Sequence, residues 1–450
     1  AGVHPNSITY ISVLKACGIV GFVTIGQDIH AAIRRKGELF HKDNILLGTA
    51  LVDMYSKCGA LEKAREVFIG LPEQSVVSWN ALTAGYVQHG HGEAALGCFR
   101  RMQDEGISPD GVSFASILKA CGSIGSLEIG YEVHAQIKDQ GLLENDIVLA
   151  TALLDMYAKC GVLVKAQEAF EQFPERNVVV WSALIAGYVQ HGYGDTALEC
   201  FRKMQDEGIS PNFVTFISVL KACGIIGCLE IGETIHENVK QQGLLENDIV
   251  LGNALVDMYA KCGSLQKAQE VFEDLPTQGV VAWNALICGQ SQMGQAKQVF
   301  KLFNKMRADG IFPDLISFLI LLSACSHAGL VEEAQVIFDS MCDVYHFSPE
   351  LEHVSCMVDL FGRAGRFDKV RSVLDKLPNM DYLPVFAALL GACCKWVNVE
   401  FGIWAFEKLV QLDGQRAASY VCMRNIYDAA GMHGEAVPFS VSEGEMWQAK

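Results

Sequence analysis

The chain has 450 residues, of which 50% are hydrophobic and 19% are charged, and its formal net charge is −17. Such a composition excludes an intrinsically disordered chain, because enough apolar surface is available for a core. The acidic balance disfavours bulk electrostatic binding to nucleic-acid phosphates, although it permits recognition of exposed bases on one local surface. The longest apolar run, Leu315–Cys325, is too short to span a bilayer, so no transmembrane helix is predicted.

The chain contains an internal repeat. Three similar segments of 35 residues occur, and their tryptophans lie 102 residues apart both times: Val76–Asp110 with Trp79, Val178–Asn212 with Trp181, and Val280–Asp314 with Trp283. A regular period of this kind predicts an array of structural units that pack mainly on their neighbours.

Each 35-residue unit predicts two helices. In Val178–Asn212 the first helix is expected over Trp181–Gln190, and Gly192 marks a turn. A second helix is expected to open at Asp195, with its apolar residues on one face, and to end before Pro211.

Two other kinds of unit fill the rest of each period with the same two-helix pattern. The long units are Ser7–Asn44, Gly111–Asp146, Phe213–Asp248 and Leu315–Glu350, and the short units are Ile45–Ser75, Ile147–Asn177, Ile249–Gly279 and Leu351–Tyr382. We therefore expect an all-α fold, an α-solenoid in which helix-turn-helix repeats stack into a right-handed superhelix.

The repeat pattern divides the chain into four segments. Residues 1–6 are interpreted as the end of a truncated repeat, and residues 7–382 are predicted to form the array. Residues 383–436 contain two further predicted helix pairs, and residues 437–450 fit no repeat and are expected to be a degenerate or truncated tail.

The 16 cysteines follow the repeat, with Cys58, Cys160 and Cys262 at one recurring position. Cysteines that recur at fixed places of a helical repeat are interpreted as small buried apolar residues rather than as disulfide partners. This interpretation favours a reducing compartment. The repeated histidines of the long units, His30, His134 and His236, are likewise interpreted as packing residues.

Several phrases closely resemble one family. They include VVSWNAL at Val76–Leu82, LVDMYSKCGALEKAREVF at Leu51–Phe68 and LLSACSHAGLVEEA at Leu321–Ala334. These residues resemble plant pentatricopeptide repeat proteins of the PLS subclass, which alternate motifs of 35 residues with longer and shorter ones. The resemblance covers residues 1–382, and residues 383–436 resemble the E motifs of organellar RNA-editing factors.

This resemblance implies recognition of single-stranded RNA at one base per repeat. In the family, the fifth residue of a motif hydrogen-bonds the base, the last residue supports the choice, and an apolar second residue packs on the base face. The implied base-packing residues are Val77, Val148, Val179, Val250 and Val281.

The family's pairings imply a base for each unit. Uridine is implied by Asn80 with Asp110 and by Asn284 with Asp314, and adenosine by Thr151 with Asn177 and by Ser182 with Asn212. Thr49 with Ser75 implies a purine, whereas Asn253 implies a pyrimidine although Gly279 departs from the pattern. The long units have Ala115, Ile217 and Leu319 at the fifth place and are expected to be spacers, and Glu352 departs from the apolar second place. Because protein and RNA run parallel in the family, the implied site is 5′-purine-U-N-A-A-N-pyrimidine-U-N-3′.

Catalysis is not expected in this chain. The family's cytidine deaminase domains combine His-x-Glu with a distant Cys-x-x-Cys at a zinc ion. The triplets His91–Glu93 and His433–Glu435 fit the first part, but no two cysteines are spaced as Cys-x-x-Cys. No phosphate-binding loop or nucleophile elbow is present either, so neither a metal nor another cofactor is predicted.

Alternatives remain for both the site and the function. Asn, Ser and Thr near helix starts are commonly N-caps, but capping does not explain polar fifth residues in two unit types and apolar ones in the third. The leading interpretation is a site-recognition factor for C-to-U editing in a mitochondrion or chloroplast, with single-stranded RNA as partner and a deaminase supplied in trans. No membrane or DNA partner is expected. An RNA stabilisation or processing factor and a peptide-binding scaffold are the alternatives.

Overall fold

The computed structural model describes residues 5–35, 45–144, 146–173, 176–245, 248–374, 383–412 and 417–432. These residues form helices and turns and contain no β-strand. The chain divides into two compact units, residues Ala1–Ile226 and Gly227–Lys450, and each is described by itself.

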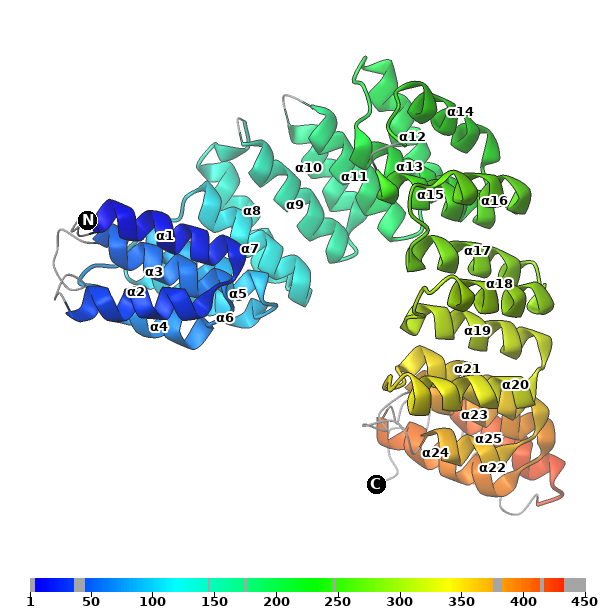
Figure 1. Ribbon diagram of the computed structural model, residues 1–450. Coiled ribbons are helices and arrows are strands. Elements are labelled where there is room, and N and C mark those ends of the chain that lie inside the picture. Colours follow the sequence, from blue (N-terminus) through cyan, green and yellow to red (C-terminus); the bar gives the residue numbers. More distant parts are fainter. Residues whose placement is uncertain are drawn as a thin grey trace. The chain divides into compact units, whose positions relative to one another are not determined.

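The first compact unit is a succession of short helices (Figure 1). They are α1 (Ser7–Val20), α2 (Val23–Arg35), α3 (Ile45–Lys57), α4 (Leu61–Ile69), α5 (Val76–Gln88), α6 (Gly92–Asp104), α7 (Gly111–Ile124), α8 (Leu127–Asp139), the 3₁₀ turn η2 (Leu142–Glu144), α9 (Ile147–Lys159), α10 (Leu163–Gln172), α11 (Val178–Gln190), α12 (Gly194–Asp206) and α13 (Phe213–Ile226).

The second compact unit continues the same arrangement. Its helices are α14 (Leu229–Gln241), α15 (Ile249–Lys261), α16 (Leu265–Asp274), α17 (Val280–Gln292), α18 (Ala296–Ala308), α19 (Leu315–Ala328), α20 (Val331–Asp339), the π turn η3 (Ser340–Val344), α21 (Leu351–Ala364), α22 (Phe367–Leu374), α23 (Leu383–Trp396), α24 (Val399–Leu412) and α25 (Ala417–Ala429).

Odd-numbered helices are the first helices of the repeats, and even-numbered helices are the second. In the first compact unit, each odd-numbered helix from α1 to α11 contacts the next one, and the seven odd-numbered helices from α1 to α13 form one layer. In the second, the odd-numbered helices from α15 to α25 form a layer in the same way. Second helices pack beside their own first helices, as α6 does on α5 and α18 on α17. The predicted all-α solenoid of helix pairs is confirmed.

The helix starts are set by caps. The side chain of Asn177 accepts hydrogen bonds from the amides of Val179 and Val180, so α11 begins at Val178, three residues before the predicted start. Gly192 follows the helix with φ of 78°, a left-handed conformation that favours glycine and turns the chain into α12. Capping by the last residue of one repeat therefore fixes where the next repeat begins.

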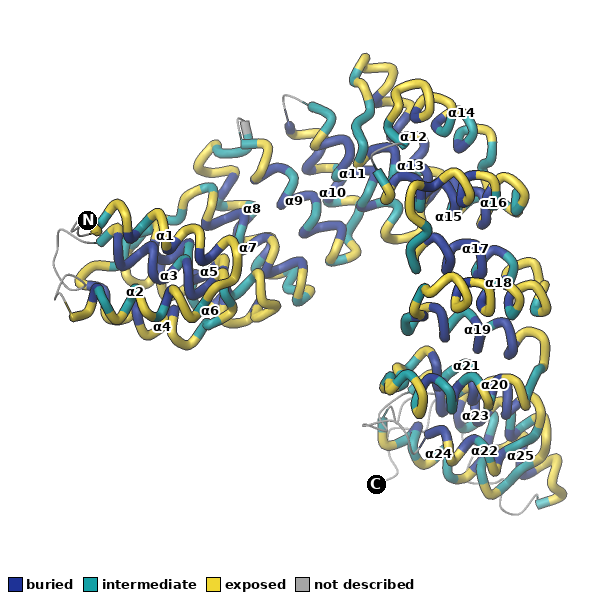
Figure 2. The backbone as a smooth tube through the Cα atoms, in the orientation of Figure 1, coloured by how far each residue is buried: buried dark blue, intermediate teal, exposed yellow. Residues whose placement is uncertain are grey.

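The first helices hold most of the core. Figure 2 shows buried positions concentrated in helices such as α3, α9 and α11, whereas α4, α14 and α18 are largely exposed on one side. Trp181 of α11 is buried and its ring meets Phe170 of the preceding repeat edge-on, with ring centroids 4.5 Å apart. This contact ties neighbouring repeats together, as expected for a solenoid.

Close packing of α3 on α5 depends on Gly85. A Cβ atom added there would collide with the Cβ of Ser56, which lies on the neighbouring first helix. We expect Gly85→Ala to lower the stability of the first compact unit by about 1–3 kcal/mol, because the helices must separate. Thermal unfolding followed by circular dichroism measures this loss.

Gly97 provides the matched control. It is exposed on α6, and an added Cβ would meet no atom within 4 Å. Gly97→Ala should therefore raise stability by up to about 1 kcal/mol through helix propensity alone. Equal effects of the two substitutions would contradict the packing role of Gly85.

The C-terminal part contains the predicted pair α23–α24, followed by α25. The last predicted helix and residues 437–450 lie outside the described residues, as do residues 1–4. Among the residues that the structure describes, no helix is both long and apolar enough to cross a membrane.

Candidate functional site

Asn80 and Asp110, the fifth and last residues of the first 35-residue unit, are in contact. The Asn80 Nδ2 atom donates a hydrogen bond of 2.9 Å to Asp110 Oδ1. Ser113 completes the group, because its hydroxyl donates to Asn80 Oδ1 at 2.6 Å and its amide donates to Asp110 Oδ1 at 2.9 Å. Burial acts to raise the pKa of Asp110, but the hydrogen bonds from Ser113 and Asn80 outweigh it and hold the pKa below its usual value.

The third 35-residue unit repeats this arrangement. Asn284 Nδ2 donates to Asp314 Oδ1 at 2.9 Å, and the Ser317 hydroxyl donates to Asn284 Oδ1 at 2.7 Å. Both units that are predicted to prefer uridine thus have the same three side chains in the same geometry.

The middle unit has shorter side chains in the same places. The Ser182 hydroxyl donates to the Val178 carbonyl at 2.6 Å and lies 2.6 Å from Thr215 Oγ1. It is 3.4 Å from Asn212 Oδ1, which also accepts the Thr215 amide at 2.9 Å. The predicted adenosine pair is therefore brought together more loosely than the uridine pairs.

The short units differ. Thr49 and Thr151 donate to carbonyls of their own helices, Ile45 and Ile147, at 2.9 Å. Their predicted partners are used as caps: Ser75 accepts from the Ser78 amide, and Asn177 caps α11. No hydrogen bond joins either threonine to its predicted partner in the described residues.

Asn253 is the exception among the asparagines at the fifth place. Its Oδ1 atom is buried and has no hydrogen-bond partner in the described part of the chain. Gly279 stands where the other units have Asp or Asn and provides no side-chain cap for α17. The third place of the next unit is Ala282, which has no hydroxyl.

The polar fifth residues are well inside their helices, one turn beyond the caps. Asn80, Asn284 and Ser182 are only 8%, 7% and 3% exposed. The last residues Asp110 and Asp314 are the N-caps of α7 and α19. Capping therefore explains part of the role of the last residues and none of the role of the fifth residues.

The apolar second residues are exposed, unlike most of their helices. The exposed fraction of the five predicted valines ranges from 45% at Val179 to 62% at Val148, with Val77, Val250 and Val281 between them. Other second places are exposed as well, and sequence reasoning did not single them out: Ile8, Leu46, Val112, Val214 and Ile316. The sequence feature that could have identified them is the apolar residue at the second place of every unit that precedes Leu351–Tyr382.

Exposed lysines lie on the same face as these apolar residues. Lys119 is at the ninth place of its long unit, seven residues after Val112 and therefore two turns further along the same side of α7. Lys15 and Lys221 hold the same place in their units. The lysines of the short units are instead paired with an aspartate four residues earlier, as Lys159 is with Asp155 at 2.7 Å.

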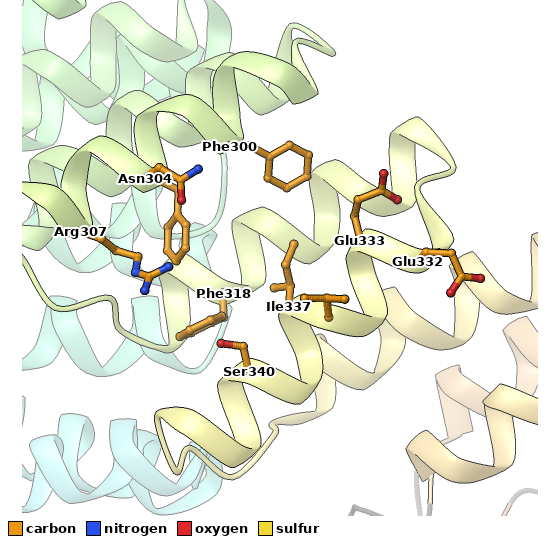
Figure 3. A pocket seen from close by; sticks show the side chains of 10 residues that line it. Phe300, Asn304, Arg307, Phe318, Glu332, Glu333, Ile337 and Ser340 are labelled. Atoms are coloured by element: carbon orange, nitrogen blue, oxygen red, sulfur yellow. The ribbon is translucent and has the colours of Figure 1, made fainter.

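A cavity of about 530 Å³ lies elsewhere, among α18, α19 and α20 (Figure 3). Its lining includes Phe300, Phe318, Val336 and Arg307, and none of the predicted base-selecting residues. The candidate face, formed by the exposed second residues of the first helices and the fifth residues beside them, is therefore separate from this cavity.

The repeated histidines contact tyrosines. His30, His134 and His236 place Nδ1 within 3.0, 2.7 and 2.9 Å of the hydroxyls of Tyr55, Tyr157 and Tyr259. Burial lowers the pKa of each histidine, which keeps the rings neutral and suits a packing role.

The 16 cysteines are free thiols, with Cys17, Cys121, Cys223 and Cys325 buried. The described residues contain no cluster of three or more His, Cys, Asp or Glu side chains that could hold a metal ion. His91 precedes α6 in a repeat turn, and His433–Glu435 lie outside the described residues.

The helix pairs and their recurring polar and apolar places define a helical-repeat protein. Models of the PPR repeat family match residues 74–123, 176–224 and 278–327, and a PPR repeat model matches residues 49–76, 148–178, 253–280, 316–344 and 352–382. Together these matches cover more than half of the chain. The chain belongs to the pentatricopeptide repeat family.

Relatives from Arabidopsis thaliana agree with this assignment. One pentatricopeptide repeat-containing protein is 37% identical over 427 residues, and these cover 95% of this chain and 58% of the relative. Another, named as chloroplastic, is 36% identical, with 95% and 52% covered. A third, named as mitochondrial, is 37% identical, with 94% and 67% covered. The chain thus spans about half to two thirds of the length of these relatives.

Among solved structures, the pentatricopeptide repeat protein PPR10 in complex with an 18-nt psaJ RNA element aligns with 97% of this chain and 74% of that chain. The sequence identity is 18% and the TM-score is 0.47.

Proposed function

We propose that this chain binds single-stranded RNA and recognises bases along its odd-numbered helices. The observation behind the proposal is the recurrence of one arrangement: a polar fifth residue held by a neighbouring last residue, beside an exposed apolar second residue. An exposed valine beside fixed hydrogen-bonding groups suits a base, which offers an apolar face and a polar edge.

The proposed base-selecting residues are Thr49, Ser75, Asn80, Asp110, Thr151, Asn177, Ser182, Asn212, Asn253, Asn284 and Asp314. The exposed second residues would pack on base faces, and Lys15, Lys119 and Lys221 would contact phosphates. This local distribution allows RNA binding by a chain whose net charge is −17.

We further propose that the chain is of the PLS subclass. Residues 7–382 would form the array and residues 383–436 an E-like region, with residues 437–450 as a degenerate tail. The fit of 35-residue, long and short units to one recurring period supports this organisation.

In an organelle, either mitochondrion or chloroplast, such a chain would select RNA sites for C-to-U editing, with the deaminase supplied in trans. No catalysis is proposed for this chain itself. RNA crosslinked to the protein in its organelle should contain cytidines whose conversion stops when the protein is absent. Unchanged conversion with reduced abundance of the bound RNA would instead favour a stabilisation factor.

RNA binding can be tested directly with the predicted site. We expect the chain to bind 5′-purine-U-N-A-A-N-pyrimidine-U-N-3′ at least about tenfold more tightly than the same RNA with the AA pair changed to CC, because two recognised bases are lost. Affinity should fall as salt rises, owing to the phosphate contacts. Fluorescence anisotropy with labelled RNA measures both effects.

Asn80→Ala combined with Asn284→Ala should strongly lower the affinity for the predicted site and remove the preference for U at the two positions assigned to these residues. Asn304→Ala is the matched control, because Asn304 is an exposed asparagine on the second helix α18 and away from the candidate face. Equal affinity of the unaltered chain for the predicted site and for the RNA with CC in place of AA would contradict the proposal. Affinity for peptides with none for RNA would favour the scaffold alternative.

A further inference from the structure

Each 35-residue unit is followed by a long unit. The third residue of the long unit contacts the fifth residue of the 35-residue unit that precedes it. Ser113, Thr215 and Ser317 place their hydroxyl oxygens 2.6, 2.6 and 2.7 Å from the side chains of Asn80, Ser182 and Asn284. All three of these hydroxyl residues are buried. The same contact thus occurs three times across the boundary between successive units.

In the uridine units the contact fixes which way the asparagine amide points. A carboxylate only accepts hydrogen bonds, so Asp110 must face the Nδ2 group of Asn80. The Oδ1 atom then faces Ser113, whose hydroxyl is closer to it (2.6 Å) than to Asp110 Oδ1 (2.9 Å). Both ends of the amide are occupied, and the free group is the second N–H of Nδ2.

Because Ser113 engages the amide oxygen, the group left for a base is the second N–H, which is a donor. The donor matches the O4 carbonyl of uridine and is mismatched with the N4 amino group at the same position of cytidine, which is itself a donor. We infer that Ser113 and Ser317 are positioning residues that make their units prefer uridine to cytidine. This inference rests on the proposed RNA-binding function.

Asn253 shows the arrangement without the two supporting residues. Gly279 replaces the aspartate, Ala282 replaces the serine, and Asn253 Oδ1 is buried with no hydrogen-bond partner in the part of the chain that the structure describes. Leaving a buried acceptor unsatisfied is costly, so this amide gains by turning Oδ1 toward a donor on the RNA. A unit of this kind accepts cytidine as well as uridine.

The test compares Ser113→Ala and Ser317→Ala with the unaltered chain. Binding is measured with RNAs that have U or C at the two positions assigned to Asn80 and Asn284. We expect the preference for U over C to fall about fivefold at each position, because one hydrogen bond that orients the amide is lost. Ser113→Thr keeps the hydroxyl and should retain the preference, as Thr215 keeps the contact in the middle unit.

Ser78→Ala is the matched control. Ser78 is also a buried serine at the third place of its unit, but its hydroxyl donates to the Ser75 carbonyl and not to Thr49. It should lower thermal stability as the other two variants do and leave the U-to-C preference unchanged. The base preference is the measurement that a merely structural serine would not alter.

The reverse experiment builds the arrangement around Asn253. A Cβ at Gly279 meets no atom within 4 Å, so Gly279→Asp is accommodated and also caps α17. Adding Ala282→Ser should supply the missing hydroxyl. The double variant is expected to gain about fivefold in U-to-C preference over Gly279→Asp alone at the base assigned to Asn253.

The outcomes separate the two proposals. If the unaltered chain binds RNA with no preference for U at the two positions, both the base assignment and this inference are overturned. If the preference exists and survives both serine substitutions, or if Gly279→Asp alone equals the double variant, only the role of the third-place hydroxyl is overturned.

Discussion

Trp283→Ala is expected to lower the local free energy of unfolding of the repeats around α17 by about 3–5 kcal/mol. Trp283 is 1% exposed, and its ring meets Phe272 of α16 edge-on with centroids 4.7 Å apart. Removing the indole leaves a cavity at the contact between one repeat and the next. In a solenoid this contact is part of the coupling that makes neighbouring repeats unfold together.

Hydrogen exchange of the amides in α16, α17 and α18 measures this loss without assuming that the whole chain unfolds in one step. Protection should fall by roughly a hundredfold or more, since each 1.4 kcal/mol corresponds to a factor of ten. Exchange in the first compact unit provides an internal reference. Similar losses of protection in α3 and α17 would contradict a local effect.

Two phenylalanine variants refine this test. The Nε1 group of Trp283 is buried and has no hydrogen-bond partner among the described residues, whereas Nε1 of Trp181 donates to Glu207 Oε2 at 3.1 Å. Trp283→Phe therefore removes an unsatisfied donor, and we expect it to cost less than Trp181→Phe, which breaks a hydrogen bond. The difference should be about 1 kcal/mol.

The helix pairs could be predicted from the sequence because the fold is local. A period of 102 residues that contains three pairs of apolar helices leaves few arrangements other than a stack. The helix starts depend on side-chain caps, which composition does not show. The prediction for α11 began at Trp181 because composition does not reveal that Asn177 folds back to cap Val179 and Val180.

The candidate face was only partly visible in the sequence. The fifth and last places can be identified through the family resemblance. The contact of Ser113 with Asn80 cannot, because it joins two successive units and the sequence of neither unit indicates it. Likewise, hydropathy alone would place Val112 and Val214 in the core, whereas the structure shows that they are exposed. Hydropathy identifies an apolar residue but not the side of the helix that neighbours leave open.

Changing Asn284 to serine together with Asp314→Asn is expected to convert the third 35-residue unit from uridine to adenosine preference. The pair would then match Ser182 with Asn212, whose unit has the same place in the preceding period. We expect a roughly tenfold loss of affinity for RNA with U at this position and a roughly tenfold gain for RNA with A. The ratio of the two affinities should therefore change about a hundredfold. Anisotropy with two RNAs that differ only at this base measures the ratio.

The matched control is Asn304→Ser with Asp309→Asn, which makes the same chemical changes on exposed positions of α18 and at its end. It alters the net charge equally and should leave the ratio unchanged. A change of similar size in the control would assign the effect to charge rather than to base recognition.

The middle unit gives the physical reason for the expected switch. Ser182 has no side-chain amide, and its hydroxyl donates to the Val178 carbonyl, so the fifth place of this unit offers no donor to a uridine carbonyl. Asn212 instead uses its Oδ1 atom on Thr215 and Ser182, which leaves its Nδ2 group as the donor available for the ring nitrogen of an adenine. In the converted unit Ser317 already supplies the neighbouring hydroxyl, so two substitutions complete the change. A double variant that still prefers uridine would show that base choice in this chain depends on residues outside the fifth and last places.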